Sequence, residues 1–181
     1  ELIAREYPKQ IFRCPVHLSI GQEAIASGVS INLNLGDKVL STHRSHAHYI
    51  AKGGDLFRFF AELLGRSDGC CMGRGGSMHI FDDSVGFLGS VPIVGSSLPI
   101  ASGVALAEKQ VGSGNIVVAF LGDAVVETGQ FHEALNLISL WKLPILIVIE
   151  DNGYSTYANK KVRQSSNLKL QEIVKGFGLN F

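Results

Sequence analysis

The chain has 181 residues, and its 46% hydrophobic and 18% charged content is typical of a globular protein. Sixteen basic residues balance sixteen acidic ones, so the basic surface that nucleic acid requires is not expected. The longest apolar runs are far shorter than the roughly 20 residues of a membrane-spanning helix. We therefore expect neither nucleic acid nor a membrane as a partner.

Three cysteines lack the spacing of metal ligands, and adjacent Cys70 and Cys71 are poorly placed to pair with each other. This usage favours a reducing compartment, and we expect a cytoplasmic protein. The chain starts at Glu1 rather than at a methionine and ends without a polar tail. We expect a single domain over residues 1–181, truncated at both ends.

Three helices are expected in the first part of the chain. The first covers residues 22–33, with Ile25, Val29 and Leu33 on one face. The second follows the N-cap Asp55 and ends at Gly65, with leucines and phenylalanines at helical spacing between them. The third starts at Pro99, carries Ile100, Val104 and Ala107, and ends at the glycines 112 and 114.

In the second part of the chain, the sequence pattern predicts a strand, then a helix, then a second strand. Residues 116–121 and 145–149 are short apolar runs rich in β-branched residues, which favours strands buried on both faces. Between them, Phe131, Leu135, Ile138 and Trp141 repeat at helical spacing. Such units have parallel strands, and ligands bind beyond the carboxyl ends of those strands.

Polar residues follow both strands. The first strand leads to Gly122 and Asp123, and the second leads to Asn152. A carboxylate, an amide oxygen and backbone carbonyls form a site of hard oxygen ligands that suits magnesium or calcium. Magnesium commonly shares its coordination with phosphate groups, and the start of the helix after Asp123 offers N–H groups to a phosphate. A diphosphate bridged by a metal ion is the expected ligand.

Gly-Asp-x, then a helix, then a strand ending in Asn resembles the thiamin-diphosphate motif of transketolase-like and 2-oxo acid dehydrogenase enzymes. Further motifs over nearly the whole chain resemble the alpha subunits of the 2-oxo acid dehydrogenases, of pyruvate, acetoin or branched-chain type. These motifs are His17-Leu18-Ser19-Ile20-Gly21-Gln22-Glu23-Ala24, Thr42-His43-Arg44-Ser45-His46, Gly73-Arg74-Gly75-Gly76-Ser77-Met78-His79 and Glu150-Asp151-Asn152-Gly153-Tyr154. The resemblance implies the α/β fold that binds thiamin diphosphate, with a mostly parallel sheet and helices on both faces.

The resemblance also implies the binding residues. Asp123, Asn152 and the backbone carbonyl of Tyr154 are expected to bind Mg²⁺, while Arg44 is expected to hold the diphosphate through charge-assisted hydrogen bonds. Ile93 and Val94 would lie near the aminopyrimidine ring. The remaining expected cofactor contacts are His43, Gly122, Ala124 and Val125.

His46 stands where the family has an active-site histidine, which implies a hydrogen bond to the substrate and help in acyl transfer. His48 and His79 are weaker candidates, and His132 is expected to be structural. The glycine-rich residues 73–76 lack the ending of a nucleotide-binding P-loop and predict a loop at the cofactor or subunit interface. The sulfur-containing residues beside this loop, Cys70, Cys71, Met72 and Met78, are expected to be packing residues.

Two positions depart from the usual family pattern. Ala124 replaces a common glycine but keeps its N–H, and Pro92 stands where many relatives have glycine. Each site residue also has a structural interpretation when taken singly. Asp123 would cap the following helix, Asn152 would sit in a turn, and Arg44 would form a surface ion pair.

The resemblance implies oxidative decarboxylation of a 2-oxo acid and acyl transfer to the lipoyl group of an acyltransferase core protein. It also implies a beta subunit that completes the active site, typically in an α2β2 assembly. Two alternatives remain at this stage. One is a thiamin-diphosphate enzyme that uses no lipoyl protein, such as a transketolase-like enzyme or a decarboxylase, and the other is a degenerate subunit kept for assembly.

Overall fold

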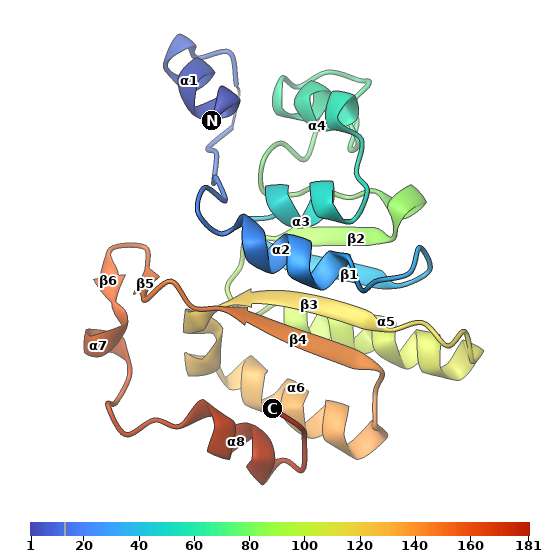
Figure 1. The fold of residues 1–181 in the computed structure, drawn as a ribbon, viewed down its shortest axis with the longest axis vertical. Coiled ribbons are helices and arrows are strands. Elements are labelled where there is room, and N and C mark those ends of the chain that lie inside the picture. The colour runs from blue at the N-terminus through green and yellow to red at the C-terminus, as the bar shows by residue number, and fades with distance from the viewer. Residues whose placement is uncertain (13) are drawn as a thin grey trace. The chain divides into compact units, whose positions relative to one another are not determined.

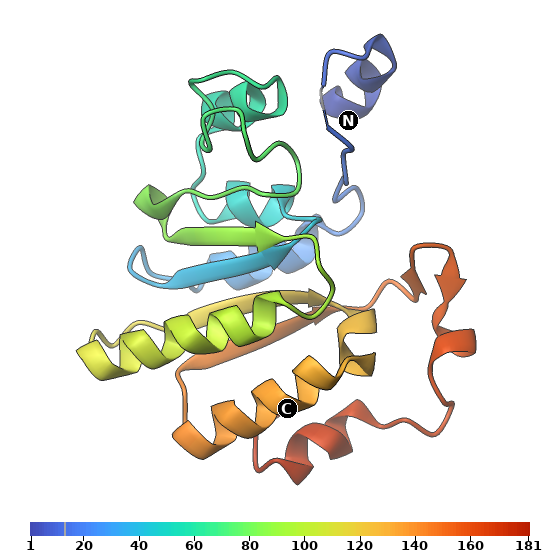
Figure 2. The same cartoon turned by 180° about the vertical axis from the view of Figure 1, so that it is seen from behind.

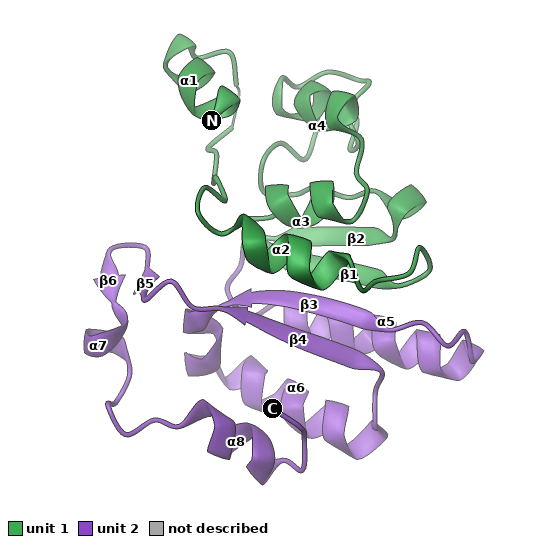
Figure 3. Cartoon of the chain, in the orientation of Figure 1, with its two compact units in different colours: residues 1–92 green, residues 93–181 purple. Residues whose placement is uncertain are grey.

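The computed structural model describes residues 1–12 and 14–181. It divides into two compact units, residues 1–92 and residues 93–181 (Figure 3). The expectation of a single domain over residues 1–181 stays a prediction. Within the described residues, no helix combines the length and the apolar character needed to cross a membrane.

The first unit contains a pair of parallel strands and several short helices (Figure 1). Its elements are α1 (Leu2–Glu6), the 3-10 helix η1 (Tyr7–Lys9), α2 (Glu23–Ser30), β1 (Lys38–Thr42), α3 (His46–Ala51), α4 (Leu56–Leu63), the 3-10 helix η2 (Asp83–Val85) and β2 (Phe87–Val91).

The core of the first unit lies around strands β1 and β2. Helices α2 and α3 pack together and lie in front of this strand pair in Figure 1 and behind it in Figure 2. The buried side chains include Val39, Leu40, Tyr49 and Phe87. The Tyr49 hydroxyl donates a hydrogen bond of 2.9 Å to the buried Asp82 carboxylate, so the polar end of this ring is satisfied.

Helix α4 confirms the sequence expectation. The Asp55 side chain accepts a 2.7 Å hydrogen bond from the Arg58 N–H, which is the predicted N-cap. Gly65 has a φ of 68° just beyond the helix, as expected for the stop. Helix α2 ends at Ser30 rather than at residue 33, and the Asn32 side chain donates to the Gly28 carbonyl at 2.8 Å. This side-chain hydrogen bond competes with a further helical turn.

The second unit is also built on two parallel strands. Its elements are α5 (Ser97–Val111), β3 (Val117–Gly122), the 3-10 helix η3 (Asp123–Glu127), α6 (Gly129–Trp141), β4 (Ile145–Glu150), β5 (Tyr154–Ser155), β6 (Ala158–Asn159), α7 (Lys160–Arg163) and α8 (Leu170–Gly176). Helix α5 packs on β3 and α6 packs beside α5, and Figure 2 shows α5 in front of the strands.

The strand, helix, strand prediction is confirmed. Strands β3 and β4 are parallel, with Val117 opposite Ile145 and Gly122 opposite Glu150, and α6 connects them. Strand β3 is buried along its length, as expected. The expectation of burial on both faces was wrong for β4, because side chains along it are only half buried and Leu146 is 45% exposed.

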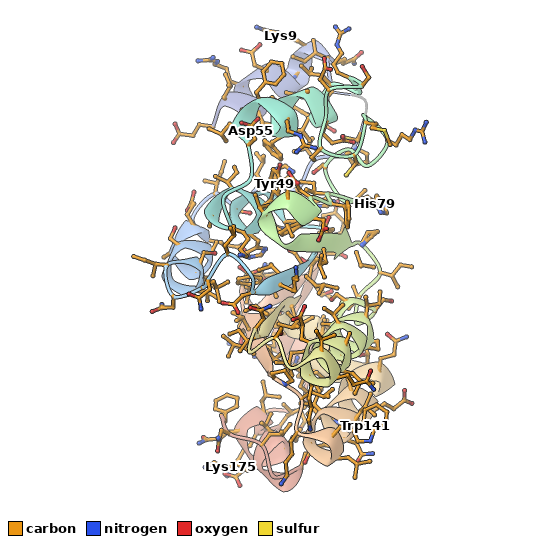
Figure 4. The ribbon with its side chains drawn as sticks, turned by 90° about the vertical axis from the view of Figure 1, so that its right-hand side faces the viewer. Lys9, Tyr49, Asp55, His79, Trp141 and Lys175 are labelled. Atoms are coloured by element: carbon orange, nitrogen blue, oxygen red, sulfur yellow. The ribbon has the colours of Figure 1, made fainter. Side chains whose placement is uncertain are left out.

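In helix α5 the apolar residues noted in the sequence, Ile100, Val104 and Ala107, are not the buried ones. Ile100 is 49% exposed, whereas Leu98, Ala101, Ser102 and Ala105 are buried. Small alanine and serine side chains let the helix backbone approach its neighbours closely, and this close packing outweighs the larger isoleucine. In α6, Phe131 and the two following members of the stripe are buried, but the last member, Trp141, is 42% exposed (Figure 4).

Candidate functional site

The sequence-predicted residues of the first unit follow strand β1. The Arg44 N–H donates to the Thr42 hydroxyl at 3.3 Å, and the Arg44 guanidinium donates to the carbonyl of Leu18. The guanidinium thus bonds to a backbone carbonyl. The rings of His17 and His43 pack edge to face with centroids 4.7 Å apart. Burial is the main cause that lowers the pKa of His43, and the charges of His17 and Arg44 lower it further.

His46 is the first residue of α3, and its side chain is buried. Its Nε2 lies 2.8 Å from the hydroxyl oxygen of Ser77, and its ring packs edge to face on Phe59 with centroids 4.8 Å apart. Burial lowers the pKa of His46 to about 4; Ser77 opposes this shift, and the charges of His17 and Arg44 add to it. The imidazole is therefore neutral at pH 7.

The glycine-rich loop that carries Ser77 is held by Glu62, which sequence reasoning missed. One carboxylate oxygen of Glu62 accepts from Cys71 N–H at 2.7 Å and from Gly73 N–H at 2.8 Å. The other accepts from Gly75 N–H at 2.7 Å and from Gly76 N–H at 3.0 Å. Because Glu62 is buried in α4, these four bonds satisfy its charge and fix the loop to the helix.

The residues of the second unit gather at the carboxyl ends of its two strands. Gly122 at the end of β3 pairs with Glu150 at the end of β4, so Asp123 and Asn152 follow neighbouring strand ends. Strand β5, which begins at Tyr154, packs against η3. The Asn152 amide oxygen accepts from the Tyr154 N–H at 2.9 Å. Asn152 is therefore in a turn, which is also its structural interpretation.

Asp123 does not cap the crossover helix, contrary to its structural interpretation. The cap is Thr128, whose side chain accepts from the Phe131 N–H, and Asp123 instead starts η3. The helix expected directly after Asp123 is thus this short 3-10 turn, and α6 starts only at Gly129. The Asp123 carboxylate is buried and accepts a 2.7 Å hydrogen bond from the Arg163 guanidinium. Sequence reasoning missed this ion pair.

The expected aminopyrimidine contacts, Ile93 and Val94, are exposed residues in a turn before α5. Gly95 in this turn has a φ of 90°, and a Cβ there would lie 3.0 Å from the side-chain oxygens of Thr128 and Gln130. The turn therefore approaches the start of α6 closely and requires glycine. Of the other expected contacts, Gly122 ends β3, while Ala124 and the buried Val125 lie in η3.

The remaining histidines and sulfur-containing residues were weaker candidates or expected packing residues, and their surroundings are as follows. The His48 Nδ1 lies 2.7 Å from the Ser41 hydroxyl oxygen, and both side chains are buried. His79 is exposed (Figure 4), and His132 packs edge to face against the neighbouring Phe131. Buried Cys70 fits the expected packing role. Met72 is 63% exposed and lies in a turn with a φ of 56°, so the expected packing role was wrong for this residue.

The donors at the strand ends fit a divalent cation such as magnesium. The buried Asp123 carboxylate and the Asn152 amide oxygen follow neighbouring strand ends, and the carboxylate is already paired with the cationic guanidinium of Arg163. These hard oxygen donors match the ligands that magnesium prefers. The side chains present are thus suited to a divalent cation once the guanidinium is displaced.

Residues 1–179 match the model of the dehydrogenase E1 component family, and the chain belongs to this family. It is 49% identical over 139 residues to the alpha subunit of acetoin:2,6-dichlorophenolindophenol oxidoreductase from Bacillus subtilis. The matched region is 77% of this chain and 42% of that relative. It is also 49% identical over 139 residues to the pyruvate dehydrogenase E1 component subunit alpha of Rickettsia prowazekii, a match that covers 77% of this chain and 43% of that protein. The chain thus spans less than half the length of these relatives.

A further acetoin oxidoreductase alpha subunit, from Cupriavidus necator, is 46% identical over 91% of this chain and 49% of the relative. A solved structure described as a thiamin diphosphate-dependent enzyme from Mycobacterium smegmatis has a TM-score of 0.56 at 20% identity, over 91% of this chain and 26% of that chain. This similarity supports the α/β fold. The family expected from the sequence motifs is confirmed.

Proposed function

We propose that this chain is the part of a 2-oxo acid dehydrogenase alpha subunit that binds thiamin diphosphate through Mg²⁺. The observation that carries the proposal is the buried Asp123 carboxylate at the carboxyl end of β3, beside the strand that leads to Asn152. Family membership adds to it, since relatives at 46–49% identity are named as alpha subunits of pyruvate and acetoin enzymes.

We assign the cofactor contacts residue by residue. Asp123, the Asn152 amide oxygen and the Tyr154 carbonyl hold Mg²⁺, because all three are hard oxygen donors around η3 and β5. Arg44 binds the diphosphate through its charge. The contacts with the remainder of the cofactor are His43, Ile93, Val94, Gly122, Ala124 and Val125.

Bound thiamin diphosphate supplies the electron sink for loss of carbon dioxide from the 2-oxo acid. The chain supplies His46, which is neutral because burial lowers its pKa to about 4. A neutral imidazole donates through one nitrogen and accepts through the other. We propose that Ser77 donates to Nε2, since its oxygen already accepts from the His17 N–H at 3.3 Å. Nδ1 then carries the hydrogen atom, and the neutral ring donates it in a hydrogen bond to the substrate or to the acyl acceptor.

The finer parts of the function concern partners. We propose a beta subunit that completes the active site in an α2β2 assembly, and a lipoylated acyltransferase protein that takes the acyl group. The names of the relatives support a subunit assembly, because they are alpha subunits. The alternatives are an enzyme without lipoyl protein and a degenerate assembly subunit.

The test is calorimetric titration of thiamin diphosphate with Mg²⁺ into the chain assembled with its beta-type partner. We expect magnesium-dependent binding that Asp123→Asn abolishes, because this change removes the charge but keeps the shape. Asp68→Asn, which removes the charge of an exposed carboxylate, is the control and should bind normally. Absence of binding by the folded wild-type assembly would favour the degenerate subunit. Product formation without lipoylated protein would favour the other alternative.

A further inference from the structure

The Asp123 carboxylate is paired with a cation that belongs to the chain itself. Arg163, the last residue of α7, donates from one guanidinium nitrogen to Asp123 at 2.7 Å and from another to Glu127. We propose that Arg163 is a built-in counter-ion that holds the metal position of Asp123 closed, and that a divalent cation must displace it. This inference rests on the proposed function of Asp123 as a metal ligand.

The pair is a built contact rather than a casual surface ion pair. The Arg163 side chain is 12% exposed and the Asp123 side chain 5% exposed. The guanidinium also donates to the Ala158 carbonyl at 3.2 Å, which joins it to the hairpin of β5 and β6. Removing a buried carboxylate from its partner leaves an uncompensated charge, so a cation must replace Arg163 as it leaves.

The guanidinium and a metal ion compete for the same oxygen atom. Magnesium binds oxygen ligands at about 2.1 Å in a near-octahedral arrangement. A guanidinium nitrogen at 2.7 Å from Oδ2 of Asp123 occupies that space, and two cations so close together repel each other. A cavity of about 460 Å³ that includes Asp123, Asp151 and Gln164 in its lining lies beside the pair. It offers the metal ion a route to Asp123.

Displacement of Arg163 would release the segment that carries it. Helix α7 has four residues, and so short a helix is not stable by itself. It is held at its ends, by the Lys160–Asp151 ion pair and by Gln164, which donates to the Asp123 carbonyl at 3.3 Å and to Glu127 at 2.8 Å. Loss of the Arg163 hydrogen bonds to Asp123 and Glu127 removes part of what holds residues 158–164, while the contacts of Lys160 and Gln164 remain. The segment is then held more loosely, which couples metal binding to it.

The experiment uses the chain assembled with its partner and Mn²⁺ as the probe, counted by electron paramagnetic resonance. Arg163→Gln should bind Mn²⁺ about fivefold more tightly than wild type, because the competing ion pair is gone. Lys169→Gln removes the same charge from an exposed side chain outside the cavity and should leave the affinity unchanged. In wild type, saturating Mn²⁺ should make trypsin cleave after Arg163 about fivefold faster, and Asp123→Asn should abolish this acceleration.

Equal Mn²⁺ affinity of wild type and Arg163→Gln, with unchanged cleavage after Arg163, would overturn the counter-ion proposal and leave the proposed function intact. Weaker binding by Arg163→Gln would also overturn it, because Arg163 would then shape the site rather than block it. If neither protein binds Mn²⁺ even with thiamin diphosphate, both proposals fail together.

Discussion

The hydroxyl oxygen of Ser77 lies 2.8 Å from Nε2 of His46, and both side chains are buried. The two residues are 31 positions apart in the sequence and come from the glycine-rich loop and from the start of α3. A hydrogen bond in so closed a place fixes both the ring orientation and the position of its proton. Ser77 is therefore a positioning residue for the proposed role of His46.

Replacing Ser77 with alanine is expected to lower kcat about tenfold, because a buried hydrogen bond is lost and the imidazole can turn. The dissociation constant of thiamin diphosphate should stay within about twofold, since no cofactor contact is removed. Steady-state kinetics and calorimetry check the two quantities separately. Ser67→Ala, at an exposed serine, is the control. An equal loss of kcat and cofactor binding would argue against a positioning role.

The lowered pKa of His46 predicts a pH dependence of stability. Its pKa is about 4 in the folded chain, against 6.5 for an unperturbed histidine, because of burial. Between these values the unfolded chain binds a proton that the folded chain does not. The free energy of unfolding should therefore fall by about 3 kcal/mol as the pH is lowered from 6.5 to 4, and the His46 contribution should level off below that.

Urea denaturation at several pH values measures this slope. His46→Gln should flatten the slope between pH 6.5 and pH 4, whatever its effect on stability at pH 7. An unchanged slope in this variant would show that other groups cause the acid sensitivity.

Glu62→Gln should lower the free energy of unfolding by about 2–4 kcal/mol. The amide keeps the shape of the carboxylate, but its NH₂ group faces backbone N–H donors of the loop and leaves some of them unpaired. Glu133→Gln, at an exposed position of α6, is the matched control and should change stability by less than about 0.5 kcal/mol. Chemical denaturation gives both values.

Two glycine substitutions should have opposite effects on stability. At Gly75, a Cβ would lie 2.2 Å from the His79 carbonyl oxygen, so Gly75→Ala must displace the loop backbone and destabilise the chain. At Gly103 nothing lies within 4 Å of the added Cβ, and the residue is inside α5. Gly103→Ala should therefore stabilise by about 0.5–1 kcal/mol, measured by thermal unfolding. Equal shifts of both melting temperatures would contradict this account.

The sequence predicted the parts of the fold that depend on local pattern. The N-cap of Asp55, the buried β3 and the parallel pairing of β3 with β4 follow from side-chain periodicity and turn residues, and the structure confirms them. The buried face of α5 could not be predicted, because Ile100 with Val104 and Ala101 with Ala105 are both pairs at helical spacing. Only the neighbours of the helix decide which of these two faces is buried.

For the candidate site, the motifs identified the loops and strand ends but not the contacts that hold them. Arg163 is 40 positions from Asp123, and nothing in the local sequence marks it as a partner. Glu62 lies among apolar residues of α4 and is buried. An acidic residue within an apolar stretch was the sequence signal for this contact, and it was missed. Whether Arg44, His46 and Asn152 have their expected roles stays a prediction.

The attachment of the glycine-rich loop to one carboxylate has a consequence for its motion. The Glu62 carboxylate accepts the hydrogen bonds of four loop N–H groups, those of Cys71, Gly73, Gly75 and Gly76. These four hydrogen bonds therefore form and break together. When that carboxylate withdraws, the four amides become exposed to solvent in a single event. The loop should thus behave as one cooperative unit, with four correlated hydrogen-exchange rates rather than a gradual fraying from its tip.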